Sequence, residues 1–359
     1  MRLSSCQPVT TLSAALLLLL SLFVPLSCAS ATNSTSTSTS PKRGLCYIAT
    51  FHSAADSHIF TAPKSPLTWY YNYSPWPGPS SSMSQWSTEF VPMVHSASDA
   101  AVSVNTIKSI LNGSAGIPIA NPIGKPGAGR NRITHILTFN EPDGDTSSGG
   151  SNATPEHAAQ VYVDTILPLR QAPWHLEVSL PATTGSPQGL DWLRSFNASC
   201  FKLQPAGGCA FDFIAAHWYG DFAGMASWLG TLHGMYPSKP IWVTEFAIPK
   251  ASAAATRAFF NQSLPYLDGQ GSVARYAWFG AFRSGGDANE WTGDAVSLFD
   301  GNGKLTYLGA EYLGGEKNGF HQGERASSNA GFSAIKHKPW SSIWPSLAFS
   351  FATTIGWLV

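Results

Sequence analysis

Two glutamates occupy positions at which a carboxylate could do chemistry. Glu141 lies in the run Ile136-Leu-Thr-Phe-Asn-Glu-Pro-Asp143, and Glu245 lies in the apolar run Ile241-Trp-Val-Thr-Glu-Phe-Ala247. Both runs are rich in β-branched and aromatic residues and predict buried strands, which hold a side chain in a fixed place. Cleavage of a glycosidic bond needs two such groups, because one protonates the leaving oxygen while the other attacks the anomeric carbon or activates water. The pair therefore predicts a glycoside hydrolase.

Each glutamate also has a purely structural interpretation. Glu141 could be a loop residue in a turn formed by Asn140 and Asp143. Glu245 could be a buried ion-pair partner, since charged residues are rarely buried alone. Their occurrence on two separate strands favours the catalytic interpretation. Pro142 biases Glu141 toward an extended backbone, and we expect its carboxylate to project from the strand end.

Other residues at the predicted strand ends could support the two carboxylates. Asn140 could donate an amide hydrogen bond to a sugar hydroxyl. His217 or Tyr219 could hydrogen-bond Glu245 and keep it ionised and oriented, although His217 could also be an ordinary core histidine. The aromatic residues predicted to contact sugar rings, each of which could instead pack in the core, are Trp278, Trp69, Tyr71 and Trp76. No metal site or organic cofactor is predicted, because no CxxC or clustered histidine spacing is present.

The elements that would position these residues alternate along the chain. Eight short apolar runs predict strands at 44–49, 67–73, 89–95, 135–140, 177–182, 211–218, 241–246 and 274–279. Segments with helical spacing lie between several of them, at 155–169, 190–196, 222–236 and 252–264. This alternation predicts an α/β fold, a (β/α)₈ TIM barrel forming a single catalytic domain over residues 42–320. Glycine and proline crowd residues 96–131, so a seven-strand or open doubly wound sheet stays an alternative.

The two ends of the sequence differ from the predicted domain. Residues 1–31 predict a secretory signal peptide, and 32–41 a Ser/Thr-rich linker. Residues 321–339 predict a polar spacer with a candidate attachment site for a glycosylphosphatidylinositol (GPI) anchor near 327–331, and 340–359 a hydrophobic GPI signal tail. A single membrane-spanning helix is the alternative for that tail. We expect a secreted protein at the cell surface or cell wall, attached to the membrane only through the GPI anchor.

The charge composition narrows the possible binding partners, and the cysteine spacing predicts one disulfide. The 359 residues hold 21 Lys+Arg and 21 Asp+Glu, which offers no basic face for nucleic acid and suits a neutral polysaccharide. Cys200 and Cys209 enclose a short Gly-containing loop and predict a disulfide, with Cys46 buried and free. We expect a monomer. Candidate glycosylation sites are Asn33, Asn112, Asn152, Asn197 and Asn261.

Several blocks resemble, in order, those of the fungal glycosyl hydrolase catalytic core, glycoside hydrolase family 128, which includes alkali-sensitive linkage protein-like β-1,3-glucanases. The blocks are Lys42-Arg-Gly-Leu45, Trp69-Tyr-Tyr-Asn-Tyr-Ser74, Glu89-Phe-Val-Pro-Met93, Phe139-Asn-Glu-Pro-Asp143, His217-Trp-Tyr-Gly220, Ile241-Trp-Val-Thr-Glu-Phe246 and Arg275-Tyr-Ala-Trp-Phe279. The resemblance implies a retaining barrel enzyme that acts on β-1,3-glucan, with Glu141 as acid/base and Glu245 as nucleophile. Cys46-Tyr-Ile departs from the family pattern. A β-glucan transglycosylase and a non-catalytic β-glucan-binding wall protein stay alternatives.

Overall fold

The computed structural model describes residues 42–78, 88–116, 133–286 and 290–325. The predicted signal peptide, linker, GPI attachment segment and hydrophobic tail lie outside these residues, and so does Asn33. Among the helices in the described ranges, none combines the length and the apolar character that a membrane span requires.

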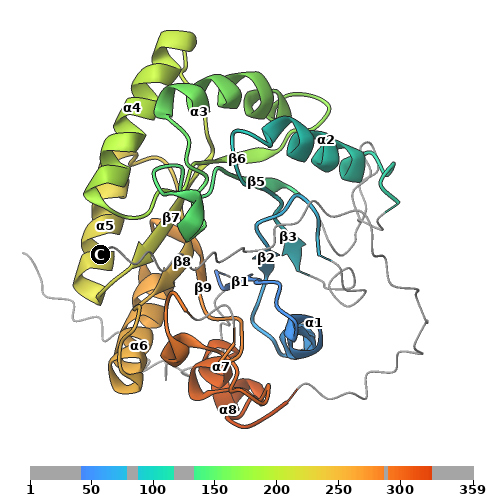
Figure 1. Ribbon diagram of the computed structural model, residues 1–359, viewed down its shortest axis with the longest axis vertical. Helices are drawn as coiled ribbons and strands as arrows, with labels where there is room; N and C mark the ends of the chain where they lie inside the picture. Colours follow the sequence, from blue (N-terminus) through green and yellow to red (C-terminus); the bar gives the residue numbers. More distant parts are fainter. Residues whose placement is uncertain (1–41, 79–87, 117–132, 287–289, 326–359) are drawn as a thin grey trace, which may run out of the picture. The chain divides into compact units, whose positions relative to one another are not determined.

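The strands form a parallel (β/α)₈ barrel, as predicted (Figure 1). They are β1 (Gly44–Cys46), β2 (Trp69–Tyr71), β3 (Glu89–Phe90), β4 (Met93–Val94), β5 (His135–Thr138), β6 (Glu177–Leu180), β7 (Phe213–Tyr219), β8 (Ile241–Ala247) and β9 (Val273–Trp278). Neighbours in this order pair in parallel, apart from β3 and β4, which are two halves of the third predicted strand. The break falls at Pro92, which has no amide hydrogen to donate to a ladder. All eight predicted strands are thus present.

The first strand joins the last and closes the ring. Isolated parallel bridges pair Arg43 with Tyr276 and Tyr47 with Ala281. The Tyr312 hydroxyl donates to the Gly44 carbonyl at 2.7 Å and accepts from the Trp278 amide at 3.1 Å, so it links β1 to β9. These contacts exclude, for this chain, the open sheet that the sequence left as an alternative.

Helices follow most of the strands, and several of them begin at a residue whose side chain caps the helix. They are α1 (Ser53–Asp56), α2 (Ala100–Leu111), α3 (Pro155–Val161), α4 (Pro187–Leu203), α5 (Phe222–Met235), α6 (Ala253–Gly269), α7 (Tyr307–Tyr312) and α8 (Gly315–Asn318). The side chains of Ser186, Asp221 and Ser252 each accept from the backbone amide three residues later, which fixes where α4, α5 and α6 begin. The predicted helix 155–169 is α3 continued by a π-helical turn (Tyr162–Ile166) and a 3₁₀ turn (Leu167–Arg170).

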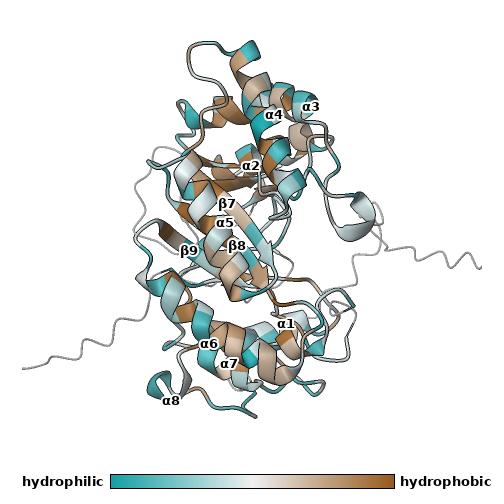
Figure 2. Cartoon of the chain, turned by 90° about the vertical axis from the view of Figure 1, so that its left-hand side faces the viewer, coloured by the Kyte–Doolittle hydropathy of each residue, from teal (hydrophilic) through white to brown (hydrophobic). Residues whose placement is uncertain are grey.

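Two apolar clusters form the core. One fills the barrel and includes Trp69, Tyr71, Phe213 and Trp242 with small residues such as Ala215. The other lies between strands and helices, and Figure 2 shows hydrophobic residues both in the strands and in the helices that cover them. A Cβ atom on Gly44 would lie 2.1 Å from the Trp69 indole, so only glycine lets this ring pack against β1.

The cysteines are arranged as predicted. Cys200 and Cys209 form a disulfide, and Cys46 is buried and free. Among the candidate glycosylation sites, Asn112, Asn152 and Asn261 are exposed, whereas Asn197 is half-buried within α4.

Candidate active site

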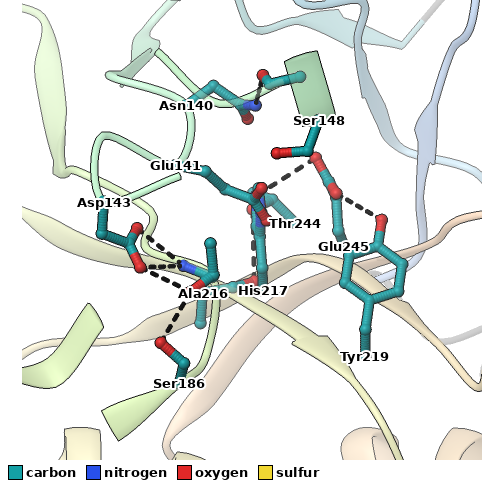
Figure 3. Close-up of polar contacts among 12 residues, drawn as sticks. Asn140, Glu141, Asp143, Ser148, Ser186, Ala216, His217, Tyr219, Thr244 and Glu245 are labelled. Atoms are coloured by element: carbon teal, nitrogen blue, oxygen red, sulfur yellow. Dashed lines mark hydrogen bonds and ion pairs between the residues drawn. The ribbon is translucent and has the colours of Figure 1, made fainter. Parts of the chain in front are cut away.

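Four barrel strands deliver the polar residues that gather at their carboxyl ends. Glu141 follows β5, His217 and Tyr219 end β7, Glu245 lies in β8, and Tyr73 follows β2. Figure 3 shows the side chains of Glu141, His217 and Glu245 close together, with the Tyr219 hydroxyl directed at Glu245. One carboxylate oxygen of each glutamate and one ring nitrogen of His217 lie within 4.8 Å of one another. This end of the barrel is where barrel enzymes place their active sites.

The backbone at Glu141 is left-handed, with φ 39°, and not extended as the following proline led us to expect. Its amide donates to the Ala182 carbonyl at 2.7 Å, and its carbonyl accepts from the amides of Gly144 and Ser151. These three backbone bonds outweigh the local preference of a residue before proline. The strain falls on the residue whose side chain enters the site, which is where proteins tend to retain it.

His217 is fully buried and lies close to both carboxylates. Its Nδ1 lies 2.8 Å from Oε1 of Glu141. Its Nε2 lies 3.3 Å from Oε1 of Glu245, an ion-pair distance without hydrogen-bond geometry. Burial acts to lower the pKa of His217, but the negative charges of Glu245 and Glu141 outweigh it and raise the pKa above its ordinary value. A positive charge between the carboxylates is thereby favoured.

Three tyrosine hydroxyls surround Glu245. Tyr73 donates to Oε1 at 2.6 Å, Tyr219 donates to Oε2 at 2.6 Å, and Tyr71 is shared between Oε1 at 3.3 Å and the Thr244 carbonyl at 3.0 Å. Burial, followed by nearby negative charge, raises the pKa of each tyrosine well above its ordinary value. The tyrosines therefore act as donors, and they hold the Glu245 carboxylate in one orientation.

Two neighbours shape the loop that follows Glu141. The Asn140 side chain is buried, and its Nδ2 donates to the Gly149 carbonyl at 3.1 Å while Oδ1 has no hydrogen-bond partner. Asp143, for which the sequence predicts no catalytic role, accepts from the Thr184 hydroxyl at 2.6 Å and from its amide. Asp143 thus ties this loop to the loop after β6.

The structure corrects part of the predicted aromatic surface. Trp278 and Trp69 have no exposed surface, and their indole N–H groups donate to the carbonyls of Val296 and Lys42. The prediction that they contact substrate is wrong, because both belong to the core. Tyr71 is equally buried but bonds Glu245, so it supports the site, while Trp76 is exposed in the loop after β2.

Three residues near the site were missed from the sequence. Tyr73 is the last residue of the predicted strand 67–73 and lies beyond the end of the observed β2, but the sequence predicted no role for it; His95 follows β4. Burial lowers the pKa of His95, partly countered by Asp99 and the two glutamates. Trp291, in the loop after β9, is 48% exposed and packs against Tyr219 with ring centroids 5.3 Å apart. No periodicity marks a loop tryptophan, so only the structure could identify it.

The chain forms a parallel (β/α)₈ barrel with two buried glutamates at the carboxyl ends of β5 and β8, which are the fourth and seventh strands when β3 and β4 count as one. This is the architecture of a glycoside hydrolase. The chain belongs to the family described as the glycosyl hydrolase catalytic core, which matches residues 44–312.

Individual relatives agree with this assignment. Alkali-sensitive linkage protein 1 of Schizosaccharomyces pombe is 30% identical over 286 residues, which cover 77% of this chain and 45% of that protein. The chain thus spans less than half the length of that curated relative. An endo-β-1,3-glucanase of Lentinula edodes, from subgroup IV of family 128, is 26% identical with a TM-score of 0.59, covering 76% of this chain and 99% of the other. A curdlan-specific exo-β-1,3-glucanase of Blastomyces gilchristii, from subgroup III and solved with glucose, is 26% identical with a TM-score of 0.55, covering 77% and 98%. The resemblance to family 128 is confirmed.

Proposed function

We propose that this chain is a retaining glycoside hydrolase that cleaves β-1,3-glucan. The observation that carries the proposal is the closeness of the two carboxylates, because one oxygen of Glu141 and one oxygen of Glu245 lie within 4.8 Å of each other. Retaining enzymes place their carboxyl groups about 5 to 5.5 Å apart, whereas inverting enzymes leave about 6.5 to 9.5 Å for a water molecule. The substrate class is supported by the β-1,3-glucanases among the structural relatives.

In this proposal Glu245 is the nucleophile and Glu141 the acid/base. A Glu245 oxygen attacks the anomeric carbon while Glu141 gives its proton to the leaving sugar oxygen. Glu141 then takes a proton from water, which attacks the same carbon and releases Glu245 as a carboxylate. His217 contacts Glu141 at 2.8 Å, and the tyrosines hold Glu245. The reaction uses these side chains and water.

Trp291 is the best-supported position for a sugar ring. Its exposed indole packs against Tyr219, whose hydroxyl bonds Glu245. The backbone of the loop is held where the Lys250 amide donates to the Thr292 carbonyl at 2.7 Å. The apolar faces of a glucosyl unit suit such a surface. The proposal extends to β-1,3-glucan as a class, since the relatives include both endo- and exo-acting enzymes.

The proposal is tested by release of reducing sugars from laminarin, a soluble β-1,3-glucan. The purified protein is compared with Glu141→Gln, Glu245→Gln and the control Glu177→Gln, whose side chain is 60% exposed at the opposite end of the barrel. We expect losses of roughly 10²- to 10⁴-fold in the first two and none in the control. Binding of laminarin without release by the parent would instead indicate a binding protein, and elongated products would indicate a transglycosylase. Export and GPI anchoring stay predictions, because their segments lie outside the described residues.

A further inference from the structure

We propose that Tyr73 is a positioning residue that fixes the non-attacking oxygen of the nucleophile Glu245, and that Cys46 supports Tyr73 from behind. The inference rests on the proposed function. It starts from the hydrogen bond of 2.6 Å between the Tyr73 hydroxyl and Glu245 Oε1, and from the contact of 3.1 Å between that hydroxyl and Cys46 Sγ.

The two oxygens of Glu245 differ in their surroundings. Oε1 accepts from Tyr73 and Tyr71, and His217 Nε2 lies 3.3 Å from it. Among the residues that the structure describes, Oε2 accepts from Tyr219 alone. A carboxylate oxygen has two lone-pair positions. Oε2 therefore keeps one lone pair for attack on the anomeric carbon, and Oε1 is the oxygen that becomes the ester carbonyl.

The backbone at Tyr73 is held in an unfavourable conformation. Its φ is 60°, in the left-handed region that bulky side chains rarely adopt. The turn is fixed on both sides, because Asn72 Nδ2 donates to the Trp76 carbonyl at 2.8 Å and the Met93 amide donates to the Ser74 carbonyl at 3.1 Å. Strain of this kind tends to mark functional positions, and here it directs the phenol at the proposed nucleophile.

Cys46 completes a chain of donors. It ends β1, next to β2 in the barrel, and its side chain is fully buried. Burial, followed by the charge of Glu245, raises the pKa of the Cys46 thiol, which stays protonated. Because the Tyr73 hydrogen is directed at Glu245, the thiol S–H donates to the Tyr73 oxygen. Successive donors polarise one another, so the thiol strengthens the bond to Oε1.

This arrangement makes a prediction for the two chemical steps. In the first, the bond between Oε2 and the anomeric carbon forms, the glycosidic bond breaks, and the leaving oxygen takes the Glu141 proton. In the second, water attacks, Glu141 takes its proton, and the electron pair of the ester bond returns to Glu245. The Tyr73 bond stabilises the departing carboxylate in the second step. Removing this hydroxyl should therefore slow deglycosylation more than glycosylation.

The test is steady-state and trapping kinetics of Tyr73→Phe on laminarioligosaccharides with an activated aryl leaving group. Loss of a hydrogen bond to a charged group predicts a fall of about tenfold to hundredfold in kcat, with a smaller fall in kcat/KM and a lower KM. Quenched samples should hold covalent glycosyl-enzyme, detected by intact mass.

Two further variants test the contribution of the Cys46 thiol. Cys46→Ala should lower kcat and KM in the same direction as Tyr73→Phe, by about threefold, and Cys46→Ser, which keeps a donor, should restore both values. Tyr70→Phe is the matched control, because its hydroxyl lies on the same strand and bonds the Pro77 carbonyl. Its activity should match the parent.

The outcomes separate the two proposals. Parental kcat and KM in Tyr73→Phe would overturn the inference, and so would a lower kcat with an unchanged KM and no trapped glycosyl-enzyme, which indicates only fewer folded molecules. If Tyr73→Phe does not fold, the comparison of Cys46→Ala with Cys46→Ser decides the question. A parent inactive on laminarin and on the activated substrates would contradict the proposed function itself.

Discussion

Glu89 is the centre of a charged cluster at the amino ends of the strands, opposite the candidate active site. It begins β3, and its Oε1 lies 2.6 Å from His135 Nδ1 and accepts from the Thr134 hydroxyl at 2.7 Å. Its Oε2 lies 2.7 Å from Arg275 NH2, and the Arg275 guanidinium lies 4.0 Å from the centre of the Trp242 ring. We predict that Glu89→Gln destabilises the barrel and leaves catalysis unchanged.

The pKa of Glu89 sets the size of the effect. Burial alone would raise it, but the hydrogen bond with His135 and the charge of Arg275 lower it from 4.5 to about 2. Since each pKa unit corresponds to about 1.4 kcal/mol, the ionised Glu89 contributes about 3 kcal/mol to stability at neutral pH. The side chain is 14% exposed, so screening by solvent is minor.

The sign of the pH dependence follows from the lowered pKa. The stability from Glu89 is present above the unfolded pKa of about 4.5 and is lost as pH falls toward the folded value of about 2. Thermal unfolding of the parent and of Glu89→Gln is measured between pH 7 and pH 2. We expect a difference in Tm of roughly 6–10 °C at pH 7 that narrows as pH falls below about 4.5 and is nearly closed at pH 2.

Glu177→Gln is the matched control for this prediction. Its carboxylate contacts the same His135 at 3.2 Å but is 60% exposed, so its removal should cost less than about 1 kcal/mol. A difference in Tm for Glu89→Gln that stays constant from pH 7 to pH 2 would refute the electrostatic reasoning. A loss of kcat at 25 °C in the folded Glu89→Gln variant would refute the prediction that this charged cluster does not contribute to catalysis.

Three further predictions concern the site and its scaffold. Trp291→Ala should raise KM for laminarioligosaccharides by about fivefold to tenfold with little change in kcat, and an unchanged KM would remove Trp291 from the proposed sugar contacts. His217→Gln should lower kcat by about tenfold to hundredfold. Because the pKa of His217 is raised, its contribution to stability is complete below the unfolded pKa of about 6.5 and is lost as pH rises through the folded value. The difference in Tm between the parent and His217→Gln should therefore narrow as pH rises. A difference in Tm that widens as pH rises would contradict a protonated His217. Replacing both Cys200 and Cys209 by serine, which opens a loop with a sequence separation of 9, should lower the free energy of unfolding in urea by about 2.5 kcal/mol, and an unchanged value would show that the loop is equally constrained without the bond.

The sequence predicted the barrel because its strands are buried on both faces and read as continuous apolar runs. Strand positions were therefore recovered, while their ends were not: β2 stops at Tyr71, and Pro92 divides the third strand. Glu141 and Glu245 were identified because a carboxylate at the end of a buried apolar strand is costly to desolvate and is seldom found there without a partner or a function.

The sequence could not tell which residues each buried aromatic side chain contacts. Trp69 and Tyr71 both face the barrel interior, yet one packs and the other bonds the proposed nucleophile. Tyr73 reaches Glu245 through a left-handed backbone that no local preference for tyrosine predicts. His217 was recognised as a partner for Glu245, but its closer contact with Glu141 depends on the relative placement of β5 and β7.

The stereochemistry of the first product is the most direct test of the two-glutamate mechanism. Hydrolysis of a laminarioligosaccharide is followed by proton NMR from the first minutes, before mutarotation mixes the anomers. The approach of one Glu141 oxygen to within 4.8 Å of one Glu245 oxygen favours double displacement, which forms the new reducing end as the β anomer. Initial release of the α anomer would contradict double displacement through Glu245.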